Sequence, residues 1–209
     1  MTETDTPTVV RQLSTPEAAE LSRLAAVFED LQFVLKCCEE LVTRLARPSP
    51  DDVVSHALWS AALIAYCRCF PDKKAAGGLT EDDLRETGLQ GEVLEWHAML
   101  RRLRDHLTSD EVNPRERFVI GAAQEPDGRA AGIAIVSAEL PVVEELAVRQ
   151  TGRLALELST LVDRRMGEQQ RTVFESARGM SVRLLNALPE VRLADPGDGQ
   201  EAGAGGAGS

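Results

Sequence analysis

Residues 15–47 read TPEAAELSRLAAVFEDLQFVLKCCEELVTRLAR, and this stretch decides the fold. Its apolar side chains recur every three or four positions, at Leu21, Leu24, Phe28, Leu31, Leu35, Cys38, Val42 and Leu45, with Val27, Val34 and Leu41 widening the stripe. Thr15 as N-cap and Pro16 at the first helical position predict where the helix begins. A stripe this regular packs against other helices. We expect an intramolecular bundle, because the widened stripe exceeds a two-stranded seam; a dimer seam is the alternative.

Further helices are predicted on the C-terminal side of this stretch. Ser49 and Pro50 predict the start of a second helix that runs to about residue 70. Its middle, HALWSAALIAY, is apolar nearly all round, so we expect it at the bundle centre. Thr80 with Asp83 resembles a capping box and predicts a short helix that ends near residue 88. A central helix is predicted over about 91–107, with an inward stripe at Val93, Trp96, Leu100, Leu103 and Leu107.

The only β signal comes after the central helix. Two short apolar runs, residues 118–123 and 133–137, flank Pro126-Asp127-Gly128, which is good turn chemistry. We expect a small hairpin or an extended arm on the side of the bundle. Two strands alone are marginally stable, so the hairpin must pack on the helices or pair with another chain. From Pro141 to about residue 188 the chain is again helical, with Gly167 either breaking or kinking the helix.

The resulting fold class is mainly α: an antiparallel helical bundle with one small β-hairpin and disordered termini. The expected divisions are a disordered 1–14, a bundle over 15–114, a hairpin over 115–140, C-terminal helices over 141–189 and a disordered Gly/Ala-rich tail over 190–209.

Composition limits the function classes. The chain has 209 residues and a net charge of −11, so any RNA contact must use a local basic patch. No signal peptide or membrane-spanning run is apparent, and we expect a cytoplasmic protein. The pairs Cys37-Cys38 and Cys67/Cys69 lack zinc-site spacing, so we expect reduced thiols, no metal and no cofactor. No Ser-His-Asp elbow, HExxH, GxGxxG or Walker pattern occurs.

Residues 96–116, WHAMLRRLRDHLTSDEVNPRE, are the one stretch that indicates a chemistry. Arginines and a histidine crowd the end of the predicted central helix, at Arg101, Arg102, Arg104 and His106. The simpler interpretation is that cations suit the negative end of a helix.

A family resemblance rests on this stretch together with LWSAALIAYCRCF (58–70) and LTEDDL (79–84). The segment resembles a group of small actinobacterial and phage-associated helical proteins, in which RDHLTSDEVNPRE reads roughly RDKHIAHSVNPFE. These resemble the HEPN superfamily (higher eukaryotes and prokaryotes nucleotide-binding), whose members are helical bundles. Many are metal-independent endoribonucleases of toxin–antitoxin or phage-defence systems. Their motif is an Arg followed four to six residues later by a His, and two copies face each other across a dimer.

Carried onto this chain, the resemblance matches Arg104 to the motif arginine and Asn113 to a downstream residue. Asp110 stands where the motif histidine would be, and His106 is close but at a different offset. Metal-free RNA cleavage needs a base with a pKa near 7, which His provides, and an ionised Asp would repel the phosphate. A salt bridge between Arg104 and Asp110 that fixes the turn is the structural alternative.

Three functional hypotheses follow. The first is a catalytically silent bundle that binds a partner or forms a homodimer through helical faces, with Arg101, Arg102 and Asn113 as contacts for RNA or protein. The second is a metal-independent endoribonuclease that uses Arg104 with His106 or His97, and Asp110. The third is a small-ligand pocket near the aromatic residues Trp59, Tyr66 and Trp96, which could equally be core.

Overall fold

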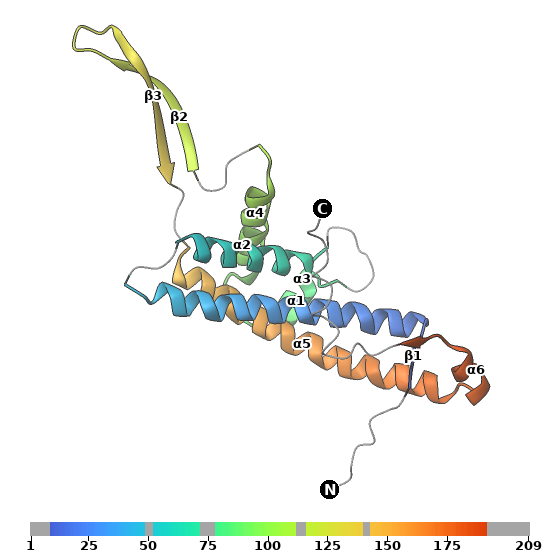
Figure 1. The fold of residues 1–209 in the computed structure, drawn as a ribbon. Helices are drawn as coiled ribbons and strands as arrows, with labels where there is room; N and C mark the ends of the chain where they lie inside the picture. The colour runs from blue at the N-terminus through green and yellow to red at the C-terminus, as the bar shows by residue number, and fades with distance from the viewer. Residues whose placement is uncertain (1–8, 49–51, 72–77, 112–115, 140–142, 192–209) are drawn as a thin grey trace, which may run out of the picture.

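The structure, a computed structural model, describes residues 9–48, 52–71, 78–111, 116–139 and 143–191. Its main helices are α1 (Pro16–Leu45), α2 (Asp52–Arg68), α4 (Val93–Thr108) and α5 (Glu145–Arg178). Two short helices accompany them, α3 (Glu81–Glu86) and α6 (Val182–Ala187). The prediction of a mainly α bundle with one small hairpin is confirmed (Figure 1).

The long helices α1 and α5 lie side by side and antiparallel (Figure 1). Gln169 near the end of α5 donates a hydrogen bond from Nε2 to the backbone oxygen of Glu17 at the start of α1, over 3.0 Å. Near the other end, a Cβ built on Gly152 would lie 3.3 Å from the Cβ of Cys38. The absence of a side chain at Gly152 therefore allows the two helices to approach closely. Helix α2 covers a second side of α1 and is itself covered by α4.

Helix α1 begins as predicted, because the Thr15 side chain accepts a hydrogen bond from the backbone N–H of Ala18 over 3.2 Å. Its apolar stripe faces the core, and the buried face is shifted toward the residues expected to widen the stripe, because Val27, Val34 and Leu41 are all buried. Leu31, Val34 and Leu41 are fully buried, whereas Leu35 and Val42 are partly covered. The shift arises because α1 packs between α2 and α5, so its buried face is wider than a contact with one helix requires.

Helix α2 is less enclosed than its composition predicts. Tyr66, Leu63 and Ala62 are fully buried, yet Val53 and Ile64 lie on a stripe that stays exposed, at 77% and 43%. The expectation of burial all round was therefore wrong for one side of the helix. Helices α1 and α4 cover only part of its circumference, and small or apolar side chains on the open side are tolerated at the surface.

The other elements follow the sequence in part. The capping box is confirmed, since Asp83 accepts from the Thr80 backbone N–H at 2.6 Å before α3 begins. The predicted start of α2 at residues 49–51 lies outside the described residues. Gly167 neither breaks nor separates the C-terminal helices, because α5 runs continuously through it to Arg178.

The first and last described strands form a two-stranded pairing that no sequence pattern predicted. Strand β1 (Val10–Arg11) pairs antiparallel with β4 (Glu190–Val191), although these residues fall in the segments expected to be disordered. Arg11 Nη1 also donates to the backbone oxygen of Leu188 over 3.2 Å. The rest of the predicted disorder, at 1–8 and 192–209, lies outside the described residues.

A hairpin of β2 (Glu116–Gln124) and β3 (Ala130–Glu139) projects from one end of the bundle, as Figure 1 shows. We call residues 116–139 the arm. Its turn contains Gly128 with φ +86°, a conformation that glycine adopts without strain, and Gly128 N–H donates to the oxygen of Glu125 over 2.8 Å. The predicted hairpin and its turn are therefore confirmed, in the form of an extended arm.

Candidate functional site

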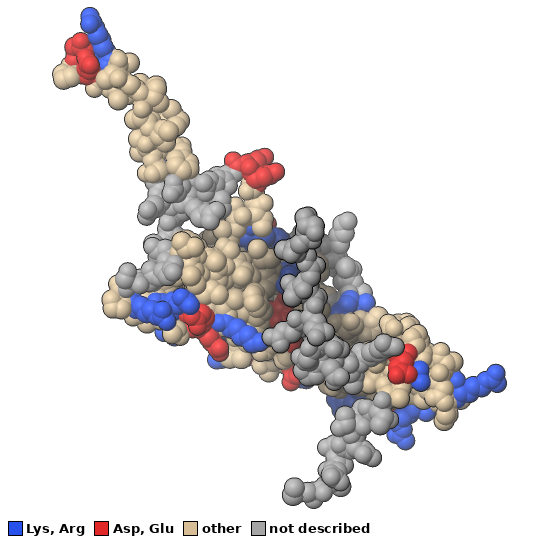
Figure 2. All heavy atoms as spheres, viewed as in Figure 1, with Lys and Arg blue, Asp and Glu red and all other residues tan. Residues whose placement is uncertain are grey.

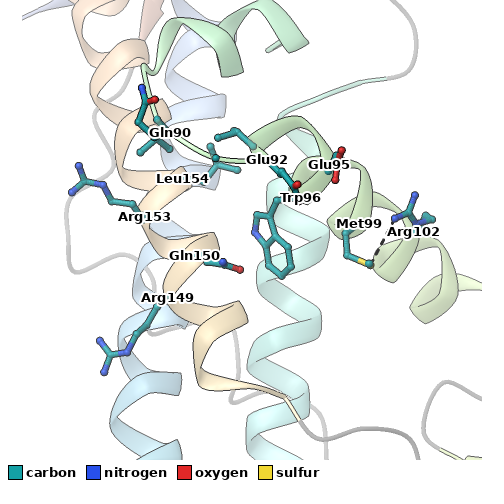
Figure 3. Close-up of a pocket in the computed structure, with 13 residues that line it drawn as sticks. Gln90, Glu92, Glu95, Trp96, Met99, Arg102, Arg149, Gln150, Arg153 and Leu154 are labelled. Atoms are coloured by element: carbon teal, nitrogen blue, oxygen red, sulfur yellow. Dashed lines mark hydrogen bonds between the residues drawn. The ribbon is translucent and has the colours of Figure 1, made fainter.

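A groove of about 840 Å³ lies between the N-terminal halves of α4 and α5 (Figure 3). Its apolar lining is Leu89, Val93, Trp96, Met99 and Leu154. Leu154 is buried at its base, and the indole of Trp96 lies across the space between the two helices. The lining residues come from segments about fifty positions apart, so only the packing of α5 beside α4 brings them together.

Charged side chains surround this groove, and two of its three arginines are paired with carboxylates. Arg149 Nε donates to Glu145 Oε1 over 2.7 Å, and Arg153 Nη2 lies 2.7 Å from Glu157 Oε1. Arg102 turns toward the groove with its Nη2 4.0 Å from the sulfur of Met99 (Figure 3). Carboxylates on α5 thus offset two of the three arginines, which leaves little positive charge for an anionic ligand.

The aromatic residues proposed as a small-ligand pocket do not meet at this groove. Trp59 and Tyr66 are buried in the core at 8% and 0% exposure, and of the three aromatic residues only Trp96 lines the groove. The Trp96 Nε1 atom is buried and has no hydrogen-bond partner among the described residues. Trp59 and Tyr66 are therefore core residues, as the alternative interpretation of these aromatic residues predicted.

The residues assigned to RNA cleavage point in different directions. Arg104 Nε lies 2.8 Å from Asp105 Oδ1, an ion pair without hydrogen-bond geometry, so the described partner of Arg104 is Asp105 and not Asp110. Because a helix turns about 100° per residue, Arg104 and His106 leave α4 roughly 200° apart. Asp110 is exposed beyond the helix end, and Asn113 lies outside the described residues. One chain does not gather these groups around a phosphate.

The two remaining arginines, Arg101 and Arg102, also point in different directions. Arg101 Nη1 donates to the backbone oxygen of Phe70 over 3.0 Å, which ties α4 to the segment that follows α2. Arg102, the next residue, is exposed at the rim of the groove. Arg101 and Arg102 therefore point in different directions, and Asn113, the third residue of the predicted contact set, lies outside the described residues.

His97 lies in the core and not at a site. It is 5% exposed, its Nδ1 lies 2.8 Å from the Tyr66 hydroxyl, and its ring packs against Phe70 with centroids 4.5 Å apart. Burial lowers the pKa of His97, and the nearby positive charge of Arg101 lowers this pKa further. A neutral imidazole enclosed in this way cannot reach a nucleic-acid substrate from the described structure.

The four cysteines are buried, and none of them forms a disulfide. Burial raises the pKa of the Cys38 thiol to about 12 and that of Cys69 to about 12, so both stay protonated at neutral pH. Protonated thiols are poor metal ligands and poor nucleophiles. Within the described ranges, no group of three or more His, Cys, Asp or Glu side chains is arranged to hold a metal ion.

The most exposed apolar surface of the described chain is on the arm. Phe118, Ile120, Ile133 and Ile135 are 50%, 63%, 75% and 70% exposed. The register pairs Ile120 with Ile135, and alternate residues share a face, so these four side chains all point to one side. We call this side the Ile face. The opposite side carries the cross-strand pair Val119 and Val136, with small residues between this pair and the tip.

Between its base and its tip the arm carries no charged residue. Residues 118–123 and 130–137 contain no Asp, Glu, Lys or Arg, in a chain in which 27% of residues are charged. Figure 2 shows this uncharged shaft, with charged side chains gathered at its tip. Among the described side chains of the arm, only Ala134 is even partly covered. The sequence predicted the hairpin, but the Ile face depends on the register and was not identified from the sequence.

No described helix combines the length and apolarity needed to cross a membrane. Neither protein-family models nor curated proteins nor solved structures include a match to this chain.

Proposed function

We propose that this chain is a non-catalytic interaction protein in which the helical bundle holds the β2–β3 arm as its binding surface. The observation that carries the proposal is the Ile face: four large apolar side chains, each at least half exposed, on the part of a two-stranded sheet that carries no charge. Exposed contiguous apolar surface of this kind is characteristic of protein–protein contacts.

The energetics of a two-stranded sheet support the same proposal. A lone hairpin is marginally stable in water, because each strand has one unpaired edge and neither face is covered. The arm obtains no cover from the bundle, since its described side chains are exposed on both faces. A binding partner would supply the missing cover and would stabilise the arm by mass action.

The bundle offers weaker candidates for the same role. Helix α1 buries its stripe against α2 and α5, so the stripe that offered a dimer seam is already occupied. The groove between α4 and α5 has an apolar floor, but its α5 arginines are paired with carboxylates of their own helix. The separation of Arg104 from His106 gives no support to the ribonuclease alternative.

Site-specific photo-crosslinking tests the proposal. A photoreactive amino acid is placed at Ile133 on the arm or, as a control, at the exposed Thr43 on α1, in cells that produce the full chain. We expect discrete crosslinked species from position 133 that position 43 does not give. Absence of any arm-specific adduct would contradict the proposed function.

A further inference from the structure

Resting on the proposed function, we propose that the partner of the arm is a second copy of this chain, with the two arms stacked antiparallel through their Ile faces. The interface would join Phe118, Ile120, Ile133 and Ile135 of one copy to the same residues of the other. Such a contact is isologous: one surface pairs with itself about a two-fold axis.

Stacking by faces accounts for the exposed side chains better than pairing by edges. An edge-to-edge contact would add hydrogen bonds, but it would leave all four large side chains of the Ile face in water. Face-to-face stacking places two sheets about 10 Å apart and removes these side chains from solvent. The opposite face is less suited to this contact, because Gly121, Ala123, Gly132 and Ala134 separate Val119 and Val136 from the tip.

Charge explains why a second copy can approach at the arm. Each chain has a net charge of −11, so contact between two bundles is opposed by repulsion. Residues 118–123 and 130–137 carry none of this charge. A strand of nine residues is about 30 Å long, several times the Debye length of about 8 Å at physiological salt. Antiparallel arms therefore hold the two bundles at opposite ends of the contact, where their repulsion is screened.

The charges at the two ends of the arm do not select an orientation. The tip carries Glu125, Asp127 and Arg129, and the end that joins the bundle carries Glu116, Arg117 and Glu139, so each end has two acidic residues and one basic residue. The orientation is set instead by the charge of the bundles. Parallel stacking would place the two tips together and would also place the two acidic bundles together.

The size of the Ile face sets the expected strength. A two-stranded face of roughly 30 Å by 10 Å is smaller than the 800 Å² or so that each partner contributes to a standard interface. We therefore expect a dimer with a dissociation constant in the micromolar range, and a monomer–dimer equilibrium that shifts with concentration.

Sedimentation velocity of the full chain, from low to high micromolar concentration, tests the proposal with two neighbouring substitutions. Ile135→Lys places a charge on the Ile face, and Val136→Lys places the same charge on the opposite face of the same strand. Both side chains are exposed, at 70% and 57%, so neither change disturbs a core. We expect wild type and Val136→Lys to dimerise with similar constants, and Ile135→Lys to dimerise at least tenfold more weakly.

A second measurement reports the orientation. A spin label is attached at Asp127→Cys, at the tip, where it reacts much faster than the buried native cysteines. Antiparallel arms put the two labels about 30 Å apart, whereas parallel arms put them near the sheet spacing of about 10 Å. A short label distance would overturn the antiparallel arrangement.

Other outcomes overturn the inference, and they show whether the proposed function fails with it. A wild-type chain that stays monomeric at high micromolar concentration refutes the second copy, and equal weakening by Ile135→Lys and Val136→Lys refutes stacking by the Ile face. If crosslinks from Ile133 then join the chain to a protein of different mass, the arm is still a binding surface and only the identity of its partner was wrong. If neither dimer nor crosslink forms, both proposals fail.

Discussion

The hydroxyl of Tyr66 on α2 lies 2.8 Å from Nδ1 of His97 on α4, inside the core. In its neutral form with the proton on Nε2, His97 accepts the hydroxyl hydrogen at Nδ1. Tyr66 is fully buried and His97 nearly so, so each group satisfies a polar atom of the other that water cannot reach. This pair joins α2 to α4 within the core.

Replacing Tyr66 with Phe tests the value of this bond. The substitution keeps the ring but leaves His97 Nδ1 without a partner in the core, which costs about 1–3 kcal/mol in the free energy of unfolding. Urea unfolding followed by circular dichroism measures the change. A cost below about 0.5 kcal/mol would mean that His97 finds another partner or admits water.

Stability should fall in mildly acidic solution because of His97. Its pKa is lowered on folding from the model-peptide value of 6.5, chiefly by burial, so the unfolded chain takes up the proton first as pH falls. The contribution to stability is complete above pH 6.5 and is lost as pH falls from there through the folded-state pKa. We expect His97→Asn to unfold more easily at pH 7.5 but to show a smaller decline between pH 7 and pH 5. A decline as steep as that of wild type would assign the pH dependence to other groups.

Two glycines in α5 should respond oppositely to the same substitution. A Cβ at Gly152 meets Cys38 of α1 at 3.3 Å, so valine overpacks the seam and should cost about 1–3 kcal/mol. A Cβ at Gly167 meets nothing within 4 Å, so Gly167→Val should gain a few tenths of a kcal/mol from helix propensity. Thermal unfolding of both variants gives the comparison. Similar losses at the two positions would show that α1 and α5 do not approach most closely at Gly152.

Local signals in the sequence predicted local structure well. Thr15 and Thr80 marked helix starts because a side-chain cap depends on residues three positions away. The turn at Gly128 was predictable for the same reason. Features that depend on residues distant in the sequence were not predicted. The β1–β4 pairing joins residues about 180 positions apart through strands of two residues, which are too short to show a period.

The candidate site shows the same limit. The register that aligns Ile120 with Ile135 could have been predicted, because the turn and the alternating pattern are both visible in the sequence. The exposure of the Ile face could not, because it depends on where the bundle lies relative to the arm. The groove could not be predicted, because Trp96 and Leu154 meet only through the packing of α4 beside α5. The arginine cluster gave one wrong expectation. Residues two positions apart leave a helix in nearly opposite directions, so Arg104 and His106 do not share a face.

Adjacent arginines on α5 should differ in their effect on stability. Arg165 Nη2 lies 2.5 Å from Oδ1 of Asp83, whose side chain is only 8% exposed, whereas Arg164 pairs with Glu86 at the surface. Arg165→Ala leaves a nearly buried carboxylate with only the capping hydrogen bonds, and we expect a cost of about 1–3 kcal/mol. Arg164→Ala should cost under about 1 kcal/mol. Denaturant unfolding compares them, and an equal cost would show that Asp83 is solvated.

RNA cleavage provides the sharpest test between the interaction hypothesis and the ribonuclease alternative. The purified full chain is incubated with end-labelled mixed RNA in EDTA, beside the Arg104→Ala and His106→Ala variants. EDTA binds divalent metal ions and so inhibits contaminating metal-dependent nucleases. We expect no cleavage by any of the three. The side chains at positions 104 and 106 diverge by roughly 200°, so one chain cannot place both on the same phosphate.

The two substitutions make a positive result interpretable. Cleavage by wild type that both substitutions abolish, with unchanged circular dichroism, would overturn the non-catalytic proposal and would require the two groups to come from different copies of a dimer. In that case Ile135→Lys should reduce cleavage as it reduces dimerisation, and Val136→Lys should not. Cleavage that survives both changes would show that Arg104 does not bind the phosphate and that His106 is not the base, so the roles assigned to them would be wrong.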